Sequence, residues 1–228
     1  MFLPNNTYSI RPFWWFWFPW FLAIAVAVLN ATLGAAGRDF LYAENGGLEF
    51  LQAITALVAA GYALACFLKV RGHKYMMIWT GVAFLGCLYI GLEEISYGQQ
   101  LLKWNTPEFW TQVNDQNETN LHNTSSWLDQ KPKLLLNIGI VVGGIIIPLL
   151  KKYKPALLPK QFNIIYPEGC LFWIATLTLL TKIAKILHKA QIFSIYDRAA
   201  EVTEFYVYYF VLLYLVMLHQ RLKNAKTA

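Results

Sequence analysis

Six long apolar stretches alternate with polar connections along the chain. Each stretch approaches the roughly 20 residues that a helix needs to cross the hydrocarbon core of a bilayer. Because the backbone finds no water there, such stretches fold as helices. The pattern predicts an all-α, polytopic membrane helical bundle with about six transmembrane helices, at residues 13–33, 48–70, 75–99, 134–150, 170–188 and 199–219.

No internal repeat or shift in composition divides the chain, so we expect a single integral membrane domain over residues 1–228. The longest connection covers residues 98–133, which is long for a simple link. Its centre, from Asn114 to Trp127, reads NDQNETNLHNTSSW in a chain that is 57% hydrophobic. That contrast makes the loop a candidate for function as well as for connection.

Composition supports the membrane interpretation and excludes two other classes. Only 14% of the residues are charged, whereas soluble domains average about 25%. The net charge of +6 comes from basic residues that punctuate apolar stretches, which is typical of membrane flanks and not of a nucleic-acid interface. Cys66, Cys87 and Cys170 lie in or beside apolar stretches without a Cys-x-x-Cys pair, so they indicate neither a zinc knuckle nor a disulfide framework.

The charges also predict an orientation. If the connections alternate sides, eleven of the nineteen basic residues fall on the side of the two termini. The positive-inside rule then places both termini in the cytoplasm and the loop 98–133 outside it. Twelve of the thirteen acids fall on the opposite side, Glu168 being the exception. Because acids contribute little to topology, their segregation suggests a function.

Carboxylates gather where the apolar stretches meet this acidic side. Glu93 and Glu94 close the third stretch, and one helical step turns their side chains about 100° apart. Glu201, Glu204 and Tyr208 recur at the spacing of one helical stripe at the start of the sixth stretch. Acids that share one site near the headgroups repel one another unless a proton or a cation compensates them. The sequence leaves both alternatives open, protonation of an acid and binding of a cation.

Of the two alternatives, a divalent metal site makes the more specific prediction. Carboxylate, amide and imidazole groups suit Zn²⁺, Mn²⁺, Fe²⁺ or Ca²⁺ better than copper(I). The predicted metal ligands are three of these acids and one histidine, namely Glu94, Glu118, His122 and Glu201. The predicted general base is Glu93 or Glu204. One histidine is few for catalytic zinc, although His188 could supply a second.

Each element of this site has a plainer alternative. The acid pair would also suit an interfacial position with salt bridges to Lys182 or Lys185, and the acids of the sixth stretch would suit a helix N-terminus. The polar run around Glu118 would suit a solvated loop. Lys182 and Lys185 would either snorkel to the interface or bind the phosphate of a lipid substrate.

The segment from Glu93 to Asn123 resembles a family. Its EEISYGQ, followed by TPEFW and NDQNETNLHN, is similar to a pattern in uncharacterised bacterial multi-pass membrane proteins. The resemblance implies a helical membrane fold in a bacterial inner membrane, and it carries no established activity. The paired glutamates also resemble the glutamate motif of intramembrane CAAX-processing proteases, but the arginine and the histidine spacings of that family are missing here.

Three functions remain open on the sequence. The first is a metal-dependent membrane hydrolase that acts on a lipid or lipid-linked substrate, and membrane lipid is then its expected partner. The second is an ion or proton pathway, for which Gln52, Thr55 and Asn137 are the available polar residues inside the stretches. The third is a sensor or structural subunit whose outer loops bind a protein partner or a second copy of the chain.

Overall fold

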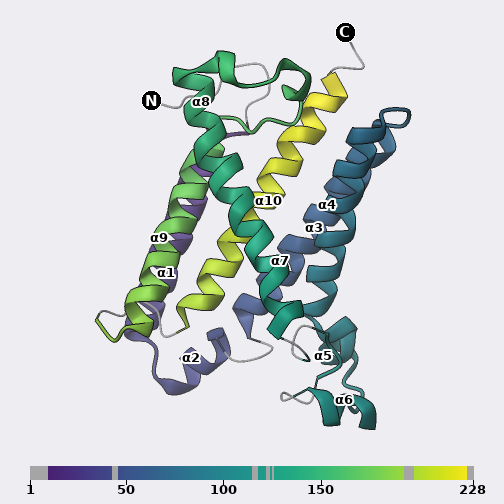
Figure 1. Ribbon diagram of the computed structural model, residues 1–228. Coiled ribbons are helices and arrows are strands. Elements are labelled where there is room, and N and C mark those ends of the chain that lie inside the picture. The colour runs from purple at the N-terminus through teal and green to yellow at the C-terminus, as the bar shows by residue number, and fades with distance from the viewer. Residues whose placement is uncertain are drawn as a thin grey trace.

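The computed structural model describes residues 10–42, 46–114, 118–121, 124, 126–192 and 198–224. Six helices in this described part are long and apolar enough to cross a membrane, and they stand side by side as a bundle (Figure 1). The predicted all-α membrane bundle is therefore confirmed, and the protein is an integral membrane protein.

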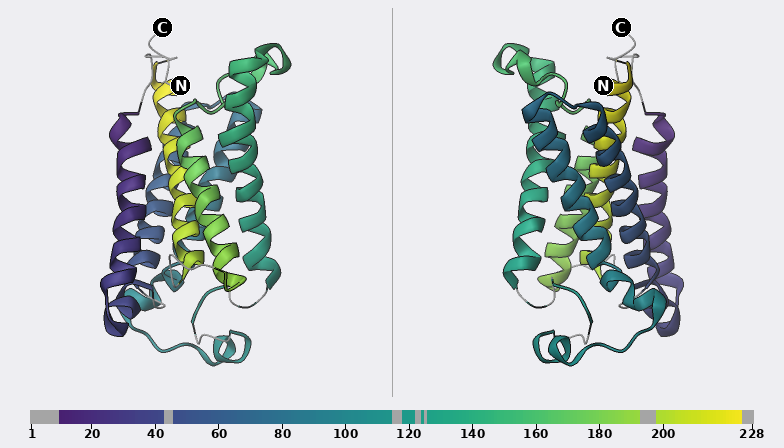
Figure 2. Two further views of the ribbon diagram at one scale, coloured as in Figure 1. Left: turned by 90° about the vertical axis from the view of Figure 1, so that its left-hand side faces the viewer. Right: turned by 90° about the vertical axis from the view of Figure 1, so that its right-hand side faces the viewer.

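The spanning helices are η1 (Phe13–Trp17) continued by α1 (Phe18–Thr32), α3 (Gly47–Lys69), α4 (Lys74–Glu93), α7 (Ser126–Gly139) continued by η4 (Ile140–Ile146) and α8 (Ile147–Tyr153), α9 (Leu171–Lys189) and α10 (Ala199–Asn224). The shorter elements are α2 (Ala35–Tyr42), η2 (Ser96–Gly98), α5 (Gln99–Leu102), α6 (Glu108–Val113), η5 (Pro155–Leu157) and η6 (Lys160–Phe162). The start of η1 and the end of α10 lie at one end of the bundle, here called the terminal end (Figures 1 and 2). The short helices α2, α5 and α6 lie at the opposite end, here called the acidic end.

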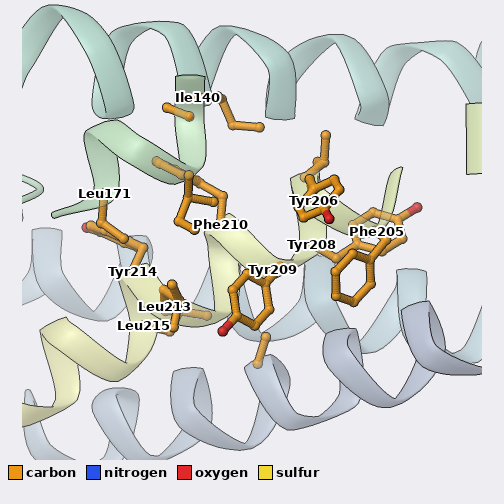
Figure 3. Packing of buried hydrophobic residues seen from close by; sticks show 14 of the residues in the cluster. Ile140, Leu171, Phe205, Tyr206, Tyr208, Tyr209, Phe210, Leu213, Tyr214 and Leu215 are labelled. Atoms are coloured by element: carbon orange, nitrogen blue, oxygen red, sulfur yellow. The ribbon is translucent and has the colours of Figure 1, made fainter. Parts of the chain in front are cut away.

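Helix α10 is the centre of the bundle. In α10, 72% of the most apolar stretch is buried, whereas no other spanning helix exceeds 44%. Its aromatic side chains fill the space between η4, which carries Ile140, and the helices of the N-terminal half of the chain (Figure 3). The outward faces of the surrounding helices are apolar, as Phe21, Ile78 and Leu135 illustrate. Apolar side chains that face outward are expected where lipid replaces water.

Two prolines explain why two of the spanning helices contain wide π-helical turns. Phe18 donates its backbone N–H to the carbonyl of Phe13, so the next donor in this register would be Pro19, which has none. The carbonyl of Trp14 is thereby left without a helical donor, and the hydroxyl of Tyr209 donates to it at 2.7 Å. Pro148 follows η4 in the same way, and the helix continues past it to Tyr153.

Small residues set the closest helix contacts. A Cβ atom at Gly144 of η4 would lie 2.3 Å from the Cβ of Ala175 and 2.9 Å from Cε2 of Phe210, so η4, α9 and α10 meet at this glycine. On α3, buried alanines that include Ala56 and Ala63 face the core. Small side chains of this kind let helix backbones approach in a membrane.

The helix boundaries differ most from the predicted stretches at two places. Helix α4 ends at Glu93, although the predicted helix runs to residue 99. Helix α7 begins at Ser126, eight residues before the predicted start, although Pro132 lies inside it. Both differences lie at the acidic end, where polar side chains and not lipid decide the backbone conformation.

Candidate functional site

The end of α4 is shaped by a left-handed turn. Ser96, Tyr97 and Gly98 follow one another with φ angles of 46°, 53° and 95°. Left-handed backbone costs roughly 1–2 kcal/mol for each residue with a Cβ atom, so the turn needs support. The hydroxyl of Tyr97 donates to Oε1 of Glu93 at 2.5 Å, and Oγ of Ser96 donates to Oε2 of Glu118 at 2.8 Å.

The same two glutamates bind the polar loop to the end of α4. The backbone N–H of Leu121 donates to Oε2 of Glu93 at 2.7 Å. Asn120 is fully buried, and its Nδ2 donates to Oε2 of Glu118 at 2.7 Å and to Oγ of Ser96 at 3.2 Å. We call this set of residues, Glu93, Ser96, Tyr97, Glu118, Asn120 and Leu121, the loop network. It explains why a hydrophobic protein carries so polar a loop, because the loop folds back onto the last turn of a helix.

Glu94 belongs to a different group. Its Oε1 accepts a hydrogen bond of 2.9 Å from the hydroxyl of Tyr208 on α10. On the same helix, Oε1 of Glu204 lies 3.0 Å from the ammonium group of Lys133 on α7. Nε2 of Gln52 on α3 donates to the carbonyl of Glu201 at 2.8 Å and lies 3.3 Å from its Oε2.

We call Glu94, Glu201 and Glu204 the carboxylate centre. The charges of these three side chains interact with one another and with Lys133. Their elements, the end of α4 and the first turns of α10, meet at the acidic end. Glu94 is the first residue beyond the spanning part of α4. Burial, and then the nearby charge of Glu204, raise the pKa of Glu94 to about 8.

This electrostatic arrangement predicts a pH dependence of stability. The folded protein holds a proton on Glu94 that the unfolded chain, with the ordinary carboxyl pKa of 4.5, releases. The free energy of unfolding is therefore expected to fall as the pH rises from about 5 to about 8, since the folded state then binds more protons than the unfolded state. Lys133, Glu201, Glu204 and Tyr208 face Glu94 and set the midpoint of this change.

Melting temperatures of the protein in detergent, measured across that pH range, would test this expectation. Glu94→Gln should flatten the dependence, whereas Glu108→Gln, which neutralises an exposed acid on α6, should leave it in place. An equal slope in both variants would contradict the assignment to Glu94.

The predicted site residues thus divide between two places. Glu94 and Glu201 lie together with Glu204, while Glu93 and Glu118 belong to the loop network. His122 lies outside the described residues. Within the described part of the chain, no group of three or more histidine, cysteine, aspartate or glutamate side chains is placed to hold a metal ion.

The predicted anion-binding lysines are on α9. Lys182 is half-buried and Lys185 is exposed, and the ion pair seen at the carboxylate centre uses Lys133 instead. Sequence reasoning did not assign Lys133 a role because the residue stands just before a predicted stretch. The position of Lys133 between an acidic loop and an apolar helix could have indicated that it pairs with an acid.

Beyond the carboxylate centre, small and apolar side chains are buried on both α3 and α10. Going toward the terminal end, α3 carries Ala56, Ala60 and Ala63 and α10 carries Leu215, each no more than 3% exposed. Cys66 follows on α3 and places its Sγ 3.9 Å from the carbonyl of Leu215. The carboxylate centre therefore stands at the acidic end of two helices that pack closely against each other.

Comparisons with known proteins add nothing to this geometry. No family model matches the chain, and neither a curated protein nor a solved structure matches it. The functional argument therefore depends on the chain's own residues.

Proposed function

We propose that the carboxylate centre is the active centre of a membrane hydrolase that acts on a lipid or lipid-linked substrate. The observation that carries this proposal is the meeting of Glu94, Glu201 and Glu204 at one end of the bundle, with Lys133 as the basic group paired to them. Ionisable residues at membrane depth are costly and usually functional. Carboxyl groups whose surroundings differ are suited to acid–base chemistry.

The proposed roles follow from the partners of each carboxyl group. Glu204, whose anion is stabilised by Lys133 at 3.0 Å, accepts a proton from the attacking water. Glu94, oriented by Tyr208, donates a proton to the leaving oxygen when the ester bond breaks. The water hydroxyl remains on the acyl or phosphoryl group, and the proton on Glu204 returns to Glu94. Glu93 serves the loop network in this scheme, because both of its oxygens accept hydrogen bonds there.

The small apolar side chains buried on α3 and α10 support a site that is confined to the acidic end. An ion or proton pathway would need polar groups that continue through the bilayer, whereas the side chains buried on α3 beyond the centre include Ala56, Ala60 and Ala63. The charge bias of the connections places the acidic end outside the cytoplasm. We therefore propose that a lipid substrate reaches the centre from the outer leaflet of a bacterial inner membrane, with its phosphate near Lys182 or Lys185.

Hydrolysis by purified protein in lipid nanodiscs is the direct test. The substrates would be phospholipids and polyprenyl diphosphates, with products identified by mass spectrometry. Glu94→Gln and Glu204→Gln are each expected to lower the rate about 100-fold, the lower range for general acid or base catalysis. Glu108→Gln is the control and should retain the rate. Turnover that survives both variants, or none with any substrate, would refute the proposal.

A further inference from the structure

Gln52 presents an unexplained oxygen beside the carboxylate centre. The side chain is fully buried, and its amide group is turned toward Glu201, to which Nε2 donates. Its Oε1 is buried without a hydrogen-bond partner in the described structure. A buried amide oxygen without a partner costs roughly 1–3 kcal/mol, so its persistence points to a group that it binds.

The electrostatics of the centre indicate the sign of that group. Three carboxyl groups gather here, and the ion pair that is seen among them in the described residues joins Lys133 and Glu204. A carbonyl oxygen attracts positive charge, as carboxylates do. An additional positive group beside Glu201 would therefore satisfy the amide oxygen and reduce the repulsion among the acids.

We infer that Gln52, Glu201 and Glu204 form a binding site for a hard divalent cation of the Ca²⁺ or Mn²⁺ class. The described donors are all oxygens, which these ions prefer, and amide carbonyls are regular ligands of Ca²⁺. Zn²⁺ favours nitrogen and sulfur ligands, so it suits this donor set less well. The inference narrows the range of metals that the sequence allows and adds Gln52 as a ligand.

Lys133 is the competitor for this site. Its ammonium group is paired with Glu204 at 3.0 Å, and in that arrangement the acids do not converge on one point. The cation therefore takes the place of the ammonium group, while Glu94 stays with Tyr208. This inference rests on the proposed function, because it concerns the same centre. A cation there would supply a water of lowered pKa for hydrolysis.

Calorimetric titration of the full-length protein in detergent tests the site without any substrate. After treatment with a chelator, the protein would be titrated separately with Ca²⁺, Mn²⁺ and Zn²⁺. Gln52→Leu should weaken binding of Ca²⁺ or Mn²⁺ by about tenfold or more, since removing even an outer-shell partner of a metal ligand has an effect of that size. Thr55→Val is the matched control on α3, since Thr55 donates only to the carbonyl of Leu51 in its own helix. Lys133→Met should tighten binding several-fold.

Each outcome has a defined meaning. Binding at one site per chain that follows this order of variants supports the inference. No binding of Ca²⁺ or Mn²⁺, equal binding in Gln52→Leu and Thr55→Val, or weaker binding in Lys133→Met would overturn it. Because titration needs no substrate, a chain that binds the cation but hydrolyses nothing contradicts only the proposed function. A chain that hydrolyses in chelator contradicts only the cation site.

Discussion

Glu93→Ala is expected to lower the free energy of unfolding by about 3 kcal/mol, because it leaves two donors of the loop network without their acceptor. The buried carboxylate accepts the hydroxyl of Tyr97 and the backbone N–H of Leu121. The left-handed turn at Ser96 and Tyr97 loses part of its support at the same time. Hydrogen exchange should therefore become faster at the amides of Thr119, Asn120 and Leu121.

Denaturant titration in detergent would measure the energy, and mass spectrometry would locate the exchange. Three buried thiols, Cys66, Cys87 and Cys170, react with a fluorescent probe only when the chain unfolds, so they report the transition. Glu108→Ala removes an exposed acid from the same end and should change neither quantity. Unchanged protection of the loop in Glu93→Ala would show that other contacts hold it.

Gly144→Ala is expected to cost a similar amount, about 3 kcal/mol. The new Cβ would lie 2.3 Å from the Cβ of Ala175 and 2.9 Å from Cε2 of Phe210, and real atoms do not approach so closely. One neighbour is a backbone-fixed Cβ on α9 and the other is a core aromatic ring on α10. Helix η4 must therefore move away from both, which loosens three helices at their meeting point.

Gly139→Ala provides the matched control on the same spanning helix. A Cβ at Gly139 meets nothing within 4 Å, and alanine is favoured over glycine in a helix by up to about 1 kcal/mol. This variant should be as stable as the native chain or slightly more stable in the same denaturant titration. Equal destabilisation by both substitutions would mean that helix propensity or the π-helical turn, and not packing, decides the result.

The six spanning helices could be predicted from the sequence because the bilayer imposes one simple requirement. A stretch without charges that is long enough to cross must satisfy its own backbone, so hydropathy alone finds α3, α4 or α9. The prolines were harder to interpret. Pro148 looks like a helix end, yet a π-helical turn absorbs it and α8 continues to Tyr153.

Part of the candidate site could also be predicted. Helical periodicity placed Glu201, Glu204 and Tyr208 on one stripe. Tyr208 donates to Glu94 at the end of α4, and the charges of Glu201 and Glu204 act on the same carboxyl group. The rotation between consecutive helical residues separated Glu93 from Glu94, and the structure gives them different partners. Their roles in catalysis or metal binding stay predictions.

The remaining features depend on contacts between distant segments. A serine and a tyrosine in left-handed conformation, at positions 96 and 97, run against their local preference, and contacts with Glu93 and with Glu118 support that turn. The ion pair of Lys133 requires α7 to begin at Ser126, well before the apolar stretch. Neither the left-handed turn nor the early start of α7 could be predicted from the neighbouring residues, because their backbone preferences favour other conformations.

Two consecutive residues, Glu93 and Glu94, hold different parts of the molecule. Glu93 accepts a hydrogen bond from the loop, through the backbone N–H of Leu121. Glu94 accepts one from the central helix α10, through the hydroxyl of Tyr208. The peptide bond between these two residues therefore connects the polar loop to the carboxylate centre. A displacement of the loop is therefore expected to act on Glu94 and Tyr208 through this one peptide bond.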